Sequence, residues 1–234
     1  MEPIDKQHFW NNKILKWEKD KYSDPKSKLG RFFDVNQSLK KRQQIAKNIL
    51  KQNAMERTVL EIGCGTARLL HSVFEAGATK YIGIDISKKA IQEGQKNARE
   101  LKIERFTEFY HLDVNALNNI NNIKADICFS LGLLDWLSLE EIEQMLSFVR
   151  CKFYFHSYSQ RNMSFQQLLH RFYVYMFYGY RTKSYVPKYY TKEKILKLFT
   201  STYKFPAKHF QSKKSFMSFV YDLPNDFKIV ETKN

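Results

Sequence analysis

The sequence lacks any apolar run of the roughly 20 residues that a membrane-spanning helix needs. Its first residues also lack the basic segment followed by an apolar one that is typical of a secretory signal. Cysteine is scarce: Cys64, Cys128 and Cys151 are scattered and form no C-x-x-C pair. This count argues against a disulfide framework and against a cysteine zinc site. We therefore expect a cytoplasmic protein with reduced cysteines and no bound metal.

Negative charge is scarce as well, since 24 Asp and Glu face 39 Lys and Arg, which gives a net charge of +15. The excess lies at the two ends of the chain. Residues 1–56 hold 13 basic and 7 acidic side chains, residues 57–150 hold 11 and 13, and the remainder holds 15 and 4. An anionic partner is one interpretation: a small phosphorylated or carboxylated molecule, a nucleic acid, or acidic lipid headgroups at a membrane surface. A lysine-rich solvated surface is the other.

Only eight glycines occur, and two of them stand one residue apart, Gly63 and Gly65. They follow a short aliphatic run that carries Glu61, and a helical pattern begins after them. This order predicts a strand, a tight turn and a helix, in which the turn leaves N–H groups free for a nucleotide or a carboxylate. A dinucleotide-binding turn would have a third glycine where this sequence has Arg68.

The next predicted strand, 80–85, ends in Asp85, where a carboxylate can accept hydrogen bonds from both ribose hydroxyls of a nucleoside. Together, Glu61, the glycine turn and Asp85 resemble the first motifs of class I S-adenosylmethionine-dependent methyltransferases. The resemblance covers about residues 56–160. It implies S-adenosyl-L-methionine as cofactor, held by strand-end residues and by aromatic residues of an N-terminal lid. The implied cofactor-binding residues are Glu61, Gly63, Cys64, Gly65, Asp85, Ile86, Asp113, Val114, Ser130, Leu131, Tyr22 and Trp17.

The sequence alternates strand and helix patterns, which is typical of a mainly parallel α/β sheet with helices on both faces. Five strands are predicted at 58–63, 80–85, 107–112, 125–130 and 152–158, with helices at about 67–76, 88–101 and 139–149. Ser87 and Ser138 are predicted helix N-caps, the latter in a capping box with Glu141. The resemblance implies two further strands, near 203–209 and 216–223, which complete seven, with the last one antiparallel.

The chain is predicted to form one methyltransferase domain over 1–234. Its parts are an N-terminal helical cap (1–55) with a loop at 22–30, a cofactor-binding core (56–160), a helical substrate-side insert (161–202) and the final strands (203–234). Within the insert, Phe165, Leu169, Phe172 and Met176 form a helical stripe, and a second helix is predicted at 191–199.

Two residues are candidates for the chemistry. Asp135 and Trp136 stand where many members of the resembled family have two histidines. Asp135 could act as a base or hold the substrate, or it could be a helix-capping or solvated acid. His156 ends the fifth strand and could accept a proton from a hydroxyl, or be structural. Trp136, Tyr158, Arg161 and Arg171 are candidate substrate-binding residues, because tyrosine and arginine suit an oxygen-rich or anionic ligand.

The predicted function is methyl transfer to oxygen or nitrogen of a small, anionic acceptor. One alternative is an RNA or other nucleic-acid methyltransferase that grips phosphates with the basic ends. Asn-Pro-Pro-Tyr and Pro-Cys signatures are absent, however, which weighs against enzymes that act on DNA bases. A second alternative is a non-catalytic protein that binds S-adenosylmethionine as a regulatory ligand.

Overall fold

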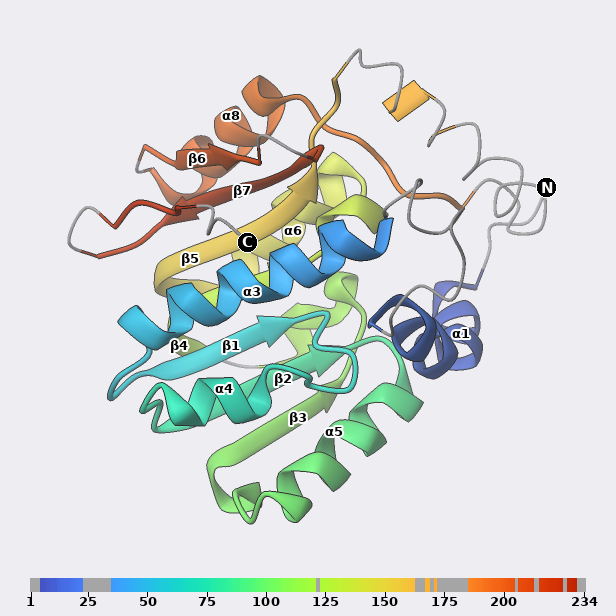
Figure 1. Cartoon of the computed structure of the whole chain (residues 1–234), viewed down its shortest axis with the longest axis vertical. Coiled ribbons are helices and arrows are strands. Elements are labelled where there is room, and N and C mark those ends of the chain that lie inside the picture. The colour runs from blue at the N-terminus through green and yellow to red at the C-terminus, as the bar shows by residue number, and fades with distance from the viewer. Residues whose placement is uncertain are drawn as a thin grey trace.

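The computed structural model describes residues 5–22, 35–120, 123–162, 167–168, 171, 185–204, 206–212, 215–224 and 227–230. Seven strands form one sheet in the order β3-β2-β1-β4-β5-β7-β6 (Figure 1). They are β1 (Thr58–Ile62), β2 (Lys80–Asp85), β3 (Thr107–His111), β4 (Lys124–Leu131), β5 (Arg150–Ser159), β6 (Lys208–Gln211) and β7 (Met217–Asp222). The first five strands are parallel, and β7 is antiparallel to both β5 and β6. The predicted seven-stranded fold is confirmed.

Helices cover both faces of the sheet because the central strands are apolar on both. Adjacent residues in β1, Val59 and Leu60, are both buried, and they belong to different hydrophobic cores. One core lies under α3 (Val35–Asn53), α4 (Leu70–Glu75) and α5 (Lys88–Glu100); the other lies under α6 (Leu139–Phe148) and α8 (Lys192–Tyr203). The period of two along a strand thus decides which core each side chain joins.

The N-terminal helix α1 (Lys6–Tyr22) lies beyond the carboxyl ends of the strands (Figure 1). The Asn11 Oδ1 atom accepts a hydrogen bond from the Ser87 hydroxyl at 3.0 Å, and Lys6 forms an ion pair with Glu141. These contacts attach α1 to the starts of α5 and α6. The helix therefore covers this edge of the sheet, and we call it the lid.

The predicted caps are present. The Ser87 hydroxyl accepts from the Ala90 N–H, and Ser138 and Glu141 form the complete capping box. Three predicted boundaries were wrong. The helix predicted at 67–76 begins only at Leu70, because Ala67 has a φ of 56° and extends the turn. The helix predicted to end at 199 continues to Tyr203, whose ring stacks on Tyr154 at 4.7 Å, so β6 begins at Lys208 rather than near 203.

The four residues of the predicted helical stripe, at 165, 169, 172 and 176, and most of the predicted loop at 22–30 lie outside the described residues. Among the helices that the structure does describe, none combines the length and the apolar character that crossing a bilayer requires. The described ranges also contain three short 3-10 helices: η1 (Glu104–Phe106), η2 (Val114–Asn119) and η3 (Leu134–Trp136).

Candidate active site

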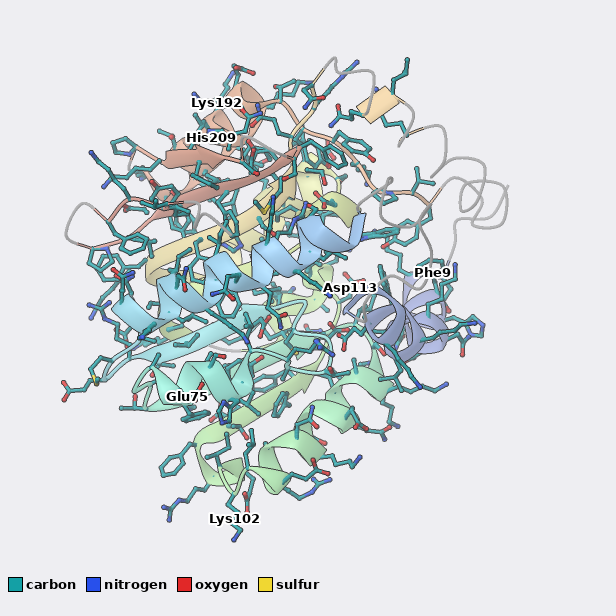
Figure 2. All side chains as sticks on the ribbon, viewed as in Figure 1. Phe9, Glu75, Lys102, Asp113, Lys192 and His209 are labelled. Carbon is teal, nitrogen blue, oxygen red and sulfur yellow. The ribbon has the colours of Figure 1, made fainter. Side chains whose placement is uncertain are left out.

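A cavity of about 220 Å³ lies at the carboxyl ends of the parallel strands, beneath α1. Figure 2 shows Asp113, which follows β3, on the same side of the molecule as Phe9 of α1. The cavity brings together most of the residues that the resemblance implied. Those that line it are Glu61, Gly63, Cys64, Gly65, Asp85, Ile86, Asp113, Val114, Leu131, Asp135 and Trp136.

The glycine turn (63–66) forms one wall, and its geometry requires glycine. Gly63 and Gly65 have φ values of 69° and 53°, in the left-handed region that disfavours other residues. A Cβ atom on Gly65 would lie 2.1 Å from Glu18 Oε1, and one on Gly63 would lie 3.2 Å from Leu133. The turn is therefore closely covered by α1 on one side and by the segment after β4 on the other.

Asp85, at the end of β2, is held by two backbone N–H groups, one in the glycine turn and one at the start of α5. Its two oxygens accept hydrogen bonds from the N–H groups of Gly65 and Ser87, both at 2.8 Å. Burial nevertheless raises the pKa of Asp85 to about 6. Each carboxylate oxygen retains a lone pair that can accept a hydrogen bond from a ligand. The two backbone hydrogen bonds therefore orient the side chain without occupying all of its acceptor sites.

Glu61 lies deeper, at 5% exposure, where the Tyr81 hydroxyl donates to it at 2.6 Å. Burial, with repulsion from Glu18 and Asp85 as a smaller contribution, raises the pKa of Glu61 to about 8. Asp113 starts η2, accepts the Asn115 N–H at 2.8 Å and faces the cavity together with Val114. Acidic groups thus follow or end three adjacent strands.

The sequence interpretation missed Glu18. This acid extends from α1 and accepts hydrogen bonds from the N–H group and the hydroxyl of Thr66, at 3.1 and 2.5 Å. The signal was available, because Lys6, Trp10, Ile14 and Glu18 recur every four residues and all line the cavity. Trp17 and Tyr22, which were predicted instead, belong to the same helix, but their side chains lie outside the described part of the structure.

Asp135 is buried at the other end of the cavity. It accepts hydrogen bonds from the Arg42 Nη1 atom at 2.9 Å and from both the N–H and the hydroxyl of Ser159. Arg42, from α3, also donates through Nη2 to Ser159 at 2.9 Å. Asp135 is therefore neither a solvated acid nor a helix cap. Arg42 is a second residue that the sequence interpretation missed.

His156 does not reach the cavity. Strand alternation directs its side chain to the face of the sheet that α8 covers. There its ring lies 5.4 Å from Phe199 of α8, and its Nδ1 atom lies 2.9 Å from the Ser130 hydroxyl. Burial lowers the pKa of His156 to about 3, which keeps the ring neutral. The structure thus gives His156 no position from which to take a proton from an acceptor, and Ser130 likewise lies off the cavity.

Tyr158 is fully buried and its hydroxyl lies 3.0 Å from His209, again away from the cavity lining. Arg161 is exposed. Arg171 is exposed too, with its guanidinium 5.8 Å from the ring of Tyr189, which does line the cavity. Of the four predicted substrate-binding residues, only Trp136 is part of the wall.

Aromatic rings close the cavity between α1 and η3. Trp10 and Trp136 meet edge to face with centroids 4.9 Å apart, and Tyr185 lies 5.1 Å from Trp136. The Trp10 Nε1 atom donates to the Tyr185 hydroxyl at 3.1 Å. Because Trp136 directly follows Asp135, the aromatic wall and the buried ion pair are parts of one region.

Comparison with known proteins agrees with this geometry. A family model described as a methyltransferase domain matches residues 53–201, which include the whole glycine turn and β1 to β5. The chain belongs to the methyltransferase family. The predicted membership among S-adenosylmethionine-dependent methyltransferases of the class I fold is confirmed, and the buried acids and the glycine turn fit that cofactor.

Individual relatives are distant. An uncharacterized protein of Haemophilus influenzae is 29% identical over 51% of this chain, a match that spans only about half, 47%, of the relative's own length. A magnesium protoporphyrin IX methyltransferase from Synechocystis PCC 6803, solved with bound SAH, aligns over 92% of this chain and 96% of its own with a TM-score of 0.66 and 19% identity. A Bordetella parapertussis protein aligns over 89% and 78% with a TM-score of 0.72 and 11% identity. At these identities, the solved structures support the fold alone.

Proposed function

We propose that this methyltransferase transfers the methyl group of S-adenosylmethionine to an oxygen or nitrogen atom of a small, planar, anionic acceptor. One observation carries the proposal. The cavity continues from the cofactor-binding acids to a second region, which is lined by Arg42, Asp135, Trp136 and Tyr185. The sheet order supports this division, since Glu61, Asp85 and Asp113 lie at or just beyond the carboxyl ends of β1, β2 and β3, whereas the second region lies beyond β4 and β5.

The lid favours a small acceptor over a polymer. Trp10 of α1 contacts Trp136 of η3 across the cavity, and the Lys6–Glu141 ion pair closes the same side. A nucleic-acid strand would need an open groove here. A flat ring of the acceptor can instead pack against this aromatic wall from the cavity side, because offset or edge-to-face contacts between aromatic rings are favourable.

Arg42 accounts for the proposed negative charge of the acceptor. Its side chain is 4% exposed, and its Nε–H group has no hydrogen-bond partner among the described residues. A buried donor without a partner costs free energy, which a carboxylate or phenolate oxygen of a ligand would recover. The Asp135 partner holds the guanidinium plane in place for that contact.

S-adenosylmethionine supplies an electrophilic methyl group on a sulfonium. The chain's own contribution is to align the acceptor atom with that group and to exclude water under α1. Asp135 remains the candidate base of the two predicted residues, since it lines the cavity and has oxygen lone pairs beyond those that Arg42 and Ser159 use. We assign it to hold the hydroxyl or N–H group that is methylated and to receive the proton that this group loses, while Arg42 binds the acid group of the acceptor.

The test is a screen for S-adenosylhomocysteine release with planar aromatic acids, each paired with its neutral amide. We expect turnover with an acid and at least tenfold lower kcat/KM with its amide. Arg42→Lys keeps the charge but loses the planar fork, so kcat/KM should fall about tenfold while the Kd for S-adenosylmethionine stays unchanged. Lys47→Ala, an exposed site on the same helix, is the matched control.

Thermal unfolding of Arg42→Lys separates a lost acceptor contact from a lost ion pair, because breaking a buried pair is strongly destabilising. Equal turnover of acids and amides, or full activity of a folded Arg42→Lys variant, would contradict the anionic acceptor. If no small acid is methylated while S-adenosylmethionine binds, the acceptor class is wrong and the cofactor assignment stands.

A further inference from the structure

The lid contributes an acid to the cofactor end of the cavity. Glu18 lies in the fourth turn of α1, is only 7% exposed and lines the cavity together with Glu61 and Asp85. Its carboxylate is bound to the glycine turn through the Thr66 N–H and hydroxyl groups. A residue of the lid, which is remote from the turn in sequence, is therefore built into the turn's surface.

The three acids are close enough to repel one another. Glu18 and Asp85 both disfavour the ionised form of Glu61, and Glu18 does the same to Asp85. Two neighbouring basic side chains partly offset this repulsion: Arg68 acts on Glu18, and His111 acts on Asp85. Burying carboxylates side by side is costly, and a cationic ligand between them would offset that cost.

We propose that Glu18 is the lid's ligand for the ammonium group of the methionine part of S-adenosylmethionine, so that cofactor binding holds α1 closed. The proposal rests on the cofactor assignment of the family and does not depend on the acceptor. An ammonium group has three N–H donors and can bind several carboxylates at once, whereas a sulfonium has no N–H donor. Glu18 therefore suits the ammonium rather than the sulfonium.

Calorimetry with three ligands tests this assignment: S-adenosylmethionine, S-adenosylhomocysteine and methylthioadenosine, which lacks the amino-acid part. For Glu18→Gln we expect the Kd of the first two ligands to rise by the same factor, about tenfold or more, because a hydrogen bond to a charged group is lost. The Kd of methylthioadenosine should stay unchanged. Glu18→Asp keeps the charge on a shorter side chain, and it should restore part of the affinity.

Lys19→Gln is the matched control, because it changes the charge of the exposed neighbouring residue on α1. Unchanged binding of S-adenosylmethionine by a folded Glu18→Gln variant would overturn the proposal. Tighter binding of both amino-acid ligands would also overturn it and show that Glu18 occupies the place of the cofactor's own carboxylate. Loss confined to S-adenosylmethionine would assign Glu18 to the sulfonium instead.

Loss of methylthioadenosine binding as well would mean that the variant damages the adenosine site, which also overturns the assignment. A wild-type chain that binds none of the three ligands would refute the cofactor together with Glu18. Failure to find an acceptor, by contrast, leaves the binding experiment intact. Hydrogen exchange of α1 gives a second readout: the proposal expects S-adenosylmethionine to protect α1 in the wild type and less so in Glu18→Gln.

Discussion

The carboxyl groups of the site differ in what surrounds them, although the sequence presents them alike. Asp85 accepts two backbone N–H groups, whereas Glu61 accepts only the Tyr81 hydroxyl within the described contacts. Hydrogen bonds from N–H groups stabilise the charged form and oppose desolvation. This difference explains why the pKa of Asp85 rises to about 6 and that of Glu61 to about 8.

Glu61 should make stability depend on pH. Since its pKa is raised on folding from 4.5 to about 8, folding takes up a proton between these values. The free energy of unfolding should therefore fall as pH rises from about 5 to about 8. Urea unfolding of the ligand-free protein at pH 6 and pH 8 measures the fall. Glu61→Gln, which keeps an acceptor for Tyr81, should reduce it, and identical pH dependence in both proteins would contradict the prediction.

At the scale of elements, β1 and α1 meet through the glycine turn, and the two missed residues both come from helices that line the cavity. Glu18 belongs to α1 and Arg42 to α3, each separated from its partner by many residues in the chain. By contrast, the alternation of side chains along β5 excludes His156 from the cavity, because it places the ring under α8. Which residues line the cavity therefore depends on where the helices pack and on which face of its strand each side chain lies.

Replacing Gly65 by alanine should displace the lid. The new Cβ would lie 2.1 Å from Glu18 Oε1, on a backbone whose φ of 53° already disfavours alanine. We expect faster hydrogen exchange in α1 and weaker binding of S-adenosylmethionine. The double variant Gly65→Ala with Glu18→Ala removes the clash but not the backbone strain, so it should recover protection of α1 only in part. Exchange as slow as in the wild type in Gly65→Ala alone would show that the lid tolerates the side chain.

For the whole molecule, part of the excess of positive charge lies away from the cavity. Lys192, Lys194 and Lys197 are exposed on α8, and Lys192 lies near His209 at the far end of the sheet from Asp113 (Figure 2). Exposed lysines on a covering helix are consistent with a solvated surface or with weak attraction of anions. The positive charge of these three lysines therefore lies away from the cavity in which methyl transfer is proposed.

We therefore expect RNA to bind weakly and without being methylated. Filter binding over a salt series should show that the logarithm of the binding constant falls linearly with the logarithm of the salt concentration. Binding should be lost near physiological salt. Replacing Lys192, Lys194 and Lys197 by glutamine should flatten this slope and leave turnover of the small acceptor unchanged. Tight RNA binding at physiological salt, accompanied by methyl incorporation into the RNA, would favour the nucleic-acid alternative instead.

The sequence by itself determined the order of strands and helices, the glycine turn and the acids at the strand ends. These features depend on local spacing: alternation defines the strands, caps such as Ser138 define helix starts, and parallel strands bring Glu61, Asp85 and Asp113 to one edge. Tertiary structure alone decided that Glu18 and Arg42 join them and that His156, Ser130 and Tyr158 do not. The physical reason is that burial and pairing depend on which helix packs over a strand end, and this packing brings together residues that no local pattern connects.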